Sequence, residues 1–315
     1  MKNKGRILAS LLFAASAVCV AQAPGAQAPG GVQGQPAVPE PIRQARQLNA
    51  QGKPDEALAV YRQFLEQNPT SYEANAGAGV VLDLKGDYTE ARKYLAKAIE
   101  VANEQQKIGA WKSMAMSYAF EHKAKDSAKY EQKAFDLQMS KQDYTAGAET
   151  ANEQARLSIE SGDLNDAEKW YKLGHETAFK KAGLSDAEKD LWNFRWEHAQ
   201  ARIAARRGKK KDAAEHVAAA KAIIDRGVID KQQAVFFPYL TGYVAFYGGD
   251  YATAIAELQK ANQRDPFILS LLAQAYEKSG QKDQAMELYK KVLTFNIHNP
   301  TGAFSRPLAK QKVGG

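Results

Sequence analysis

The stretch PFILSLLAQAYEKSGQKDQAMELYKKV, residues 266–292, contains the spacing that decides the fold. A small residue, Ala273, is followed seven positions later by Gly280 and five positions after that by Ala285. The same spacing occurs at Ala45/Gly52/Ala57, Gly79/Gly86/Ala91, Ala155/Gly162/Ala167, Ala201/Gly208/Ala213, Gly242/Gly249/Ala254 and Ala273/Gly280/Ala285. A spacing that is kept without a slip in every copy indicates a structural repeat.

This spacing predicts a unit of two antiparallel helices joined by a tight turn. The glycine ends the first helix, where a left-handed backbone is needed that only glycine adopts freely. The first small residue and the later alanine lie where the two helices cross, because a larger side chain there would push them apart. The residues after the glycine suit a helix start: Pro54 fits a first turn, and Asp87-x-x-Glu90 has the form of a capping box.

These units resemble the tetratricopeptide repeat, whose pattern is W-x2-L-G-x2-Y, then A-x3-F, then P, over about 34 residues. The last unit carries the pattern in Leu269, Leu272-Ala273-x2-Tyr276, Gly280 and Ala285-x3-Tyr289. A degenerate copy begins at Trp111, with His122 at the glycine position and Ser127 at the alanine position. It fills the gap between the second and fourth units and brings the count to seven.

The resemblance implies an all-α fold, a right-handed superhelical solenoid of antiparallel helix pairs with a concave groove lined by the first helix of each pair. The predicted units span about 41–71, 72–105, 108–141, 148–181, 194–227, 235–265 and 266–298. Extra sequence before the fifth unit, around 184–196, predicts a longer helix or loop there. A short tail, 299–315, follows. We expect Pro300 and Pro307 to keep it from continuing the last helix for long, and Phe304 and Leu308 to cap the final repeat.

The N-terminus has the layout of a secretory signal peptide. Lys2, Lys4 and Arg6 precede an uncharged apolar stretch over residues 7–20, and small residues follow. We expect a signal peptide over 1–21, cleaved between Ala21 and Gln22, and therefore an exported, periplasmic protein. Acylation of Cys19 as a lipoprotein is the less favoured alternative, because Val18 is bulky for the position before the cysteine. Residues 22–40, rich in Pro, Gly, Gln and Ala, are predicted to form a disordered linker.

The sequence lacks the motifs of common enzymes, and it predicts neither a catalytic site nor a cofactor nor a metal site. His175-Glu176 resembles the start of the zinc-protease motif H-E-x-x-H, but Phe179 stands where the second histidine should be. The formal net charge of +7 includes three basic residues of the predicted signal peptide, which leaves little reason to expect a nucleic-acid partner.

The fifth and sixth units contain the candidate partner-binding residues. In the repeat register, Arg195, His198, Arg202 and Arg206 share one face of a helix, and Tyr239, Tyr243 and Tyr247 take equivalent places in the next unit. A basic stripe beside an aromatic one suits a peptide with a carboxylate and a large apolar side chain. Packing of these aromatics against the neighbouring unit is the competing interpretation.

The most favoured function is therefore a non-catalytic scaffold of the cell envelope that binds a protein or peptide segment in the concave groove. The alternative is an envelope component that binds glycan or cell-wall polymer through the same aromatic and basic side chains. An unrecognised enzyme is the least favoured class, because it would require an acid–base or nucleophile cluster that the sequence does not display.

Overall fold

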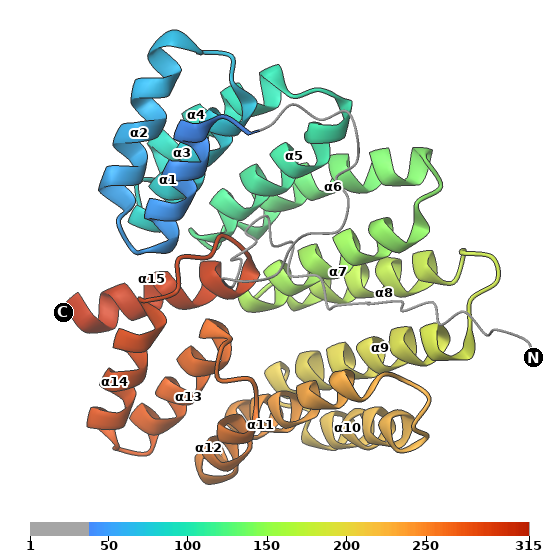
Figure 1. The fold of residues 1–315 in the computed structure, drawn as a ribbon. Helices are drawn as coiled ribbons and strands as arrows, with labels where there is room; N and C mark the ends of the chain where they lie inside the picture. The colour runs from blue at the N-terminus through green and yellow to red at the C-terminus, as the bar shows by residue number, and fades with distance from the viewer. Residues whose placement is uncertain (1–37, 315) are drawn as a thin grey trace, which may run out of the picture. The chain divides into compact units, whose positions relative to one another are not determined.

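The computed structural model describes residues 38–314, and every regular element in this range is helical. The helices are α1 (Glu40–Ala50), α2 (Pro54–Gln67), α3 (Tyr72–Lys85), α4 (Tyr88–Val101), α5 (Glu104–Ala119), α6 (Ala124–Ser140), α7 (Tyr144–Glu160), α8 (Leu164–Ala178), α9 (Asp186–Arg206), α10 (Lys210–Asp225), the 3-10 helix η1 (Lys231–Phe236), α11 (Phe237–Gly248), α12 (Tyr251–Lys260), α13 (Pro266–Lys278), α14 (Lys282–Val292) and α15 (Pro300–Gly314). Successive helices from α1 to α14 pack as seven pairs, shown in Figure 1. The predicted all-α repeat fold is confirmed, whereas the predicted signal peptide and most of the predicted linker lie outside the described residues.

Left-handed turns end the first helices of the pairs, as the glycine spacing predicts. Gly86 and Gly249 have φ angles of 95° and 84°, in the region where a side chain would be strained. In the third unit His122 takes this conformation with φ of 58°, although it carries a side chain. The turn geometry of the repeat is therefore kept even where the glycine is missing.

Close helix crossings explain the small residues of the repeat. A Cβ atom added to Gly79 would lie 2.6 Å from Cγ of Leu95 and 3.1 Å from the carbonyl oxygen of Ala91. At Gly242 the added atom would lie 2.7 Å from Cγ of Leu258. The two helices of these units can approach this closely only because the first one has no side chain at the crossing.

Capping differs in detail from the prediction. Asp87 is the N-cap of α4, but its side chain makes no capping hydrogen bond, so the predicted box with Glu90 does not form. Complete capping boxes instead begin α5, at Asn103 with Gln106, and α9, where Ser185 pairs with Glu188. The α9 helix has 21 residues, which accounts for the extra sequence of the fifth unit.

The C-terminal tail does not continue α14, which ends at Val292, but forms a separate helix that the sequence did not predict. Pro300 begins α15 and Pro307 lies inside it. This helix packs on α13 and α14 and also on α5 and α7, so it joins the last unit to the third and fourth units (Figure 1). Burial of Ala303, Phe304 and Ala309 supplies packing that offsets the hydrogen bond lost at the internal proline.

One apolar cluster joins units that are far apart in the sequence. Leu84 of α3, Phe120 after α5, Leu157 of α7, Ile268 of α13 and Phe304 of α15 all belong to it. In a simple solenoid each repeat contacts only its neighbours. Here the ends of the early first helices also pack against the last unit and α15.

Candidate protein-binding site

The structure brings the seven sequence-predicted residues together on α9 and α11. Arg206 donates from Nη1 to the hydroxyl of Tyr247 at 2.9 Å and to that of Tyr243 at 3.4 Å. Arg202 lies over the ring of Tyr239, with its guanidinium carbon 6.0 Å from the ring centre. The prediction that a basic and an aromatic stripe lie side by side is consistent with these contacts.

The two stripes meet an acidic residue that the sequence analysis missed, Glu160 at the end of α7. Nη1 of Arg206 lies 3.3 Å from Oε2 of Glu160, and Tyr243 donates to Oε1 at 3.2 Å. Arg202 donates from Nη2 to the hydroxyl of Tyr171 on α8 at 2.6 Å. Glu160 is the last residue of α7, as Arg206 is of α9, and each helix is the first of its pair. This equivalent position in the repeat is the sequence feature from which Glu160 could have been predicted.

These contacts leave little of the predicted site open to solvent. Five of the seven side chains are buried, namely Arg195, His198, Arg202, Tyr239 and Tyr243, and none of them is more than 6% exposed. The expectation that they present an accessible groove surface is wrong for this arrangement, because α7, α9 and α11 pack so that the side chains contact one another. Arg206 and Tyr247 keep partial exposure. Whether the stripe binds a partner stays a prediction.

Burial also fixes the charge of this network. Burial raises the pKa of Tyr247 to about 12, with the Glu160 carboxylate acting in the same direction, so its hydroxyl is neutral at physiological pH. Burial lowers the pKa of His198 well below its usual value, and the charges of Arg202 and Arg156 add to the effect. The histidine of the predicted basic stripe is therefore neutral, and Glu160 offsets part of the arginine charge.

Further ion pairs join the first helices of neighbouring units. Lys112 of α5 donates from Nζ to Oε2 of Glu153 on α7 at 2.6 Å. Arg195 of α9 donates from Nη1 to Oε1 of Glu149 on α7 at 2.7 Å. These charged side chains are mostly shielded from solvent, so they act as internal supports between units.

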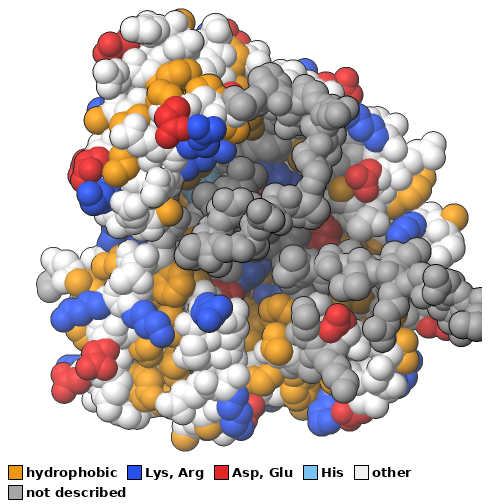
Figure 2. All heavy atoms as spheres, in the orientation of Figure 1, with side chains coloured by type: hydrophobic (Ala, Val, Ile, Leu, Met, Phe, Trp, Pro, Cys, Tyr) orange, Lys and Arg blue, Asp and Glu red, His pale blue; other side chains and the backbone are white. Residues whose placement is uncertain are grey.

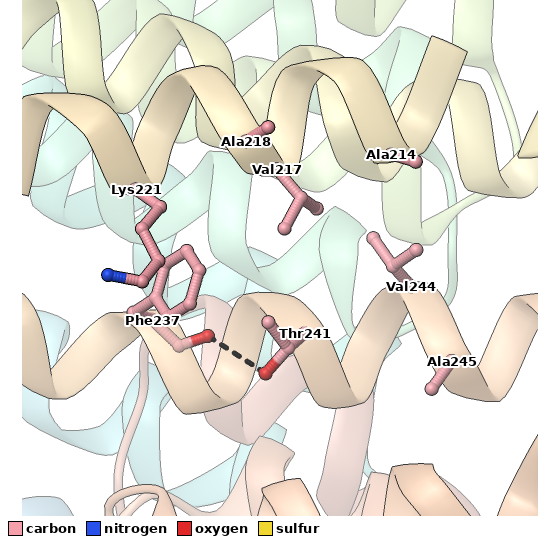
Figure 3. A pocket seen from close by; sticks show the side chains of 8 residues that line it. All are labelled: Ala214, Val217, Ala218, Lys221, Phe237, Thr241, Val244 and Ala245. Atoms are coloured by element: carbon pink, nitrogen blue, oxygen red, sulfur yellow. Dashed lines mark hydrogen bonds between the residues drawn. The ribbon is translucent and has the colours of Figure 1, made fainter. Parts of the chain in front are cut away.

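A different surface is open, a groove between α10 and α11 with a cavity volume of about 320 Å³. Its α10 wall consists of Ala214, Val217, Ala218 and Lys221, and its α11 wall consists of Phe237, Thr241, Val244 and Ala245 (Figure 3). Residues along each wall are spaced three or four apart, which places them on one face of each helix. The lining is apolar except for the hydroxyl of Thr241 and the amine of Lys221.

The groove exists because α10 and α11 pack together less closely than the corresponding helices at the other junctions between units. Residues 226–236 connect them and include Val228 and Val235, which are 44% and 50% exposed. Two large apolar side chains are therefore exposed in the segment that joins the two walls of the groove. On the face drawn in Figure 2, hydrophobic side chains lie among acidic and basic ones.

The groove could not be predicted from the sequence, because α10 has the composition of an ordinary second helix. Its sequence KKDAAEHVAAAKAIID is rich in alanine, and small residues at 214 and 218 on the side toward the next unit were the available signal. A second helix with small residues on that side cannot fill the space up to α11. Small residues such as Ala214 and Ala218 leave a gap only if the next helix stays at a distance, and that distance cannot be predicted from the sequence of α10.

Two negative findings apply to residues 38–314. Nowhere in this range are three or more His, Cys, Asp or Glu side chains grouped so that they could hold a metal ion. Within the same range no helix combines the length and the apolar character that crossing a bilayer takes.

Comparison with known proteins identifies the repeat at both ends of the array. The family model described as tetratricopeptide repeat matches residues 42–106 and 239–300. No curated protein matches the chain.

The chain is also similar to solved structures. One is a tetratricopeptide repeat protein from Parabacteroides merdae, with 14% identity, a TM-score of 0.49, and coverage of 87% of this chain and 96% of that chain. Another belongs to the APC/C hetero-tetramer Cut9-Hcn1, with 14% identity, a TM-score of 0.44, and coverage of 87% and 48%. A third is PilF of Pseudomonas aeruginosa, with 12% identity, a TM-score of 0.44, and coverage of 80% and 96%.

The repeat fold of this chain indicates a scaffold for protein–protein interaction. The two matched regions lie in one continuous series of helix pairs, whose first helices end in left-handed turns. Residues 42–106 and 239–300 therefore match the tetratricopeptide repeat, and the helix pairs between them continue the same series.

Proposed function

We propose that the protein is an exported scaffold that binds an apolar segment of a partner protein in the groove between α10 and α11. The observation that carries the proposal is the apolar lining of that groove, open to solvent at a junction where two units pack loosely. Apolar surface of this kind is costly to leave in water and is typical of interaction sites.

The lining indicates the chemistry of the partner segment. Alanine and valine side chains with one aromatic ring, that of Phe237, suit a helix that presents small or branched apolar residues three or four positions apart. Lys221 at the rim is exposed, and its amine contacts Asp225 on the same helix. An acidic residue in the partner, placed at the end of its apolar stripe, would meet this amine.

The buried Arg–Tyr network supports this proposal as a rigid base and not as the contact surface. It fixes α9 to α11 through Arg206 and Tyr247, and α11 forms one wall of the groove. Glycan binding through the aromatic stripe lacks support, because Tyr239 and Tyr243 are buried among other side chains.

Export of the protein remains part of the proposal and is supported only by the sequence of residues 1–21. Intact-mass measurement of the protein purified from its native envelope fraction tests it. A mass that corresponds to a chain beginning at Gln22 is expected. A chain that retains Met1 or Lys2 would overturn the proposed cleavage.

The groove is tested by selecting a displayed library of random peptides against the full-length protein. Peptides with apolar residues three or four apart and a neighbouring acidic residue should be enriched, and Ala218→Glu should abolish their binding. Ala252→Glu on α12 is the matched control, because Ala252 is also an exposed helical alanine but does not line the groove. Equal binding by the two variants, or enrichment of peptides without this pattern, would refute the groove as the site.

A further inference from the structure

Basic side chains of α15 donate hydrogen bonds to the last carbonyl groups of α3. Arg306 donates from Nε to the carbonyl oxygen of Leu84 at 2.8 Å. Lys310 donates from Nζ to the carbonyl oxygens of Leu84 and Lys85, at 3.1 and 2.7 Å. The last carbonyls of a helix lack partners within the helix and carry the negative end of its dipole, so positive side chains are well placed there.

Aromatic contacts hold α15 against the end of α5. The ring of Phe304 meets that of His122 edge-on, with 5.0 Å between the ring centres. Just before α15, the ring of His298 stacks on Phe120 at 5.5 Å. His122 has a left-handed backbone conformation, which is unfavourable for any residue that carries a side chain. From that position its ring contacts α15.

The contacts on α3 are mostly of a kind that another helix can reproduce. The three hydrogen bonds from α15 end on two backbone carbonyls at the end of α3, those of Leu84 and Lys85, which select for positive charge and spacing but for no particular neighbouring sequence. Beside these carbonyls lies an apolar surface formed by Leu84, Met116 and Phe120, and the ring of Phe304 packs in the same cluster. Phe304, Arg306 and Lys310 supply these features from one helix.

We propose that the ends of α3 and α5 form a helix-binding site that α15 occupies within the same chain, and that a partner helix with the pattern Phe-x-Arg-x3-Lys displaces it. Residues 293–299 connect α14 to α15 without regular helix, so α15 can move away from α3 without unwinding α14. Such a movement also breaks the hydrogen bonds from Nη1 of Arg306 to the carbonyl oxygens of Leu293 and Phe295 and the packing of α15 on α13 and α14. Displacement would remove the contacts that α15 makes with the early units and leave those of α13 in place. This site is distinct from the α10–α11 groove, and the proposal does not depend on that groove.

The test measures binding of a fluorescent peptide with the sequence of residues 299–314, NPTGAFSRPLAKQKVG, to the full-length protein. In the wild-type chain α15 competes with the peptide. The double variant Arg306→Ala/Lys310→Ala weakens α15 on α3 and should bind the peptide at least about tenfold more tightly, because the site is open for a larger fraction of the time. A peptide with glutamate at both basic positions should not bind.

Lys312→Ala is the matched control on the same helix. Lys312 contacts Glu277 of α13 and none of the carbonyls of α3, so this variant should bind the peptide as weakly as the wild-type chain does. Ala218→Glu should also leave peptide binding unchanged, which separates this test from that of the groove. A folded double variant that binds no better than the wild type would overturn the proposal and make α15 a permanent part of the fold.

If the double variant fails to fold, hydrogen exchange of the single variant Lys310→Ala decides the matter. Faster exchange of α15 amides with unchanged exchange in α13 and α14 is expected from a separable helix. Exchange of α13, α14 and α15 as one unit would overturn the proposal.

Discussion

His298 and Asp83 contact each other across 215 positions of the sequence, with 2.8 Å between Nε2 of the histidine and Oδ2 of the aspartate. Asp83 is buried within α3 and also accepts a hydrogen bond from Oγ of Ser117 at 2.7 Å. The side chain that satisfies the second oxygen of Asp83 therefore comes from the segment just before α15.

Replacing His298 with alanine should lower the free energy of unfolding by about 1–3 kcal/mol, because it leaves a buried carboxylate oxygen without its partner. Urea denaturation measures the change. His216→Ala is the comparison, since His216 contacts Glu197 at a partly exposed position and should cost less than about 1 kcal/mol. Equal losses in the two variants would show that the contact with Asp83 contributes nothing special.

Glu131→Gln should stabilise the protein at neutral pH. Glu131 of α6 is fully buried, and neither carboxylate oxygen accepts a hydrogen bond from the described residues. Burial raises the pKa of Glu131 well above its usual value, and Glu153 adds to this while Lys112 opposes it. The protonated form is therefore favoured by folding, and its contribution is lost as the pH rises through the folded pKa.

The gain from Glu131→Gln should be at least about 1 kcal/mol at pH 7 and should shrink toward pH 4. Thermal melts between pH 4 and pH 8 compare the variant with the wild type, and Glu176→Gln on the exposed face of α8 is the control. A difference that does not vary with pH would contradict the assignment of a raised pKa.

His122→Gly and His122→Ala separate backbone strain from the contact with Phe304. Both variants lose the ring, but only glycine adopts φ of 58° without strain. The glycine variant should therefore be more stable than the alanine variant by about 1 kcal/mol in urea denaturation. Gln142, with φ of 56°, offers a second position where the same pair of substitutions should give the same sign.

Gly242→Ala should destabilise the sixth unit by about 1–3 kcal/mol, because its new Cβ would lie 3.2 Å from the backbone nitrogen of Leu258 as well as against the side chain. Gly248→Ala on the same helix is the control. Nothing lies within 4 Å of a Cβ atom there, and the substitution should be neutral or stabilising by up to about 1 kcal/mol. Similar melting temperatures for the two variants would contradict the close crossing.

The repeat fold could be predicted because its constraints are local. Ala273, Gly280 and Ala285 are fixed by one helix crossing and one turn, and these requirements recur in every unit. Helix α15 could not be predicted in the same way, since Pro307 disfavours a helix locally and the compensating contacts of Phe304 come from units near the start of the array.

The candidate site was predictable only in its register. The spacing placed Arg202, Arg206 and Tyr243 on the correct faces of their helices. Whether those faces are open depends on how closely α7, α9 and α11 approach, which follows from small rotations summed over several units. For the same reason the gap between α10 and α11 could not be read from either helix alone.

The contact of α15 with α3 has a consequence for how the protein unfolds. A linear array of repeats can lose its end units one at a time, because each unit interacts only with its neighbours. Here Arg306 and Lys310 tie the end of the array to its second unit, so fraying at the C-terminus also removes support from helices more than 200 positions earlier. Melting should therefore be a single cooperative transition over residues 38–314, and early and late units should lose their helicity together.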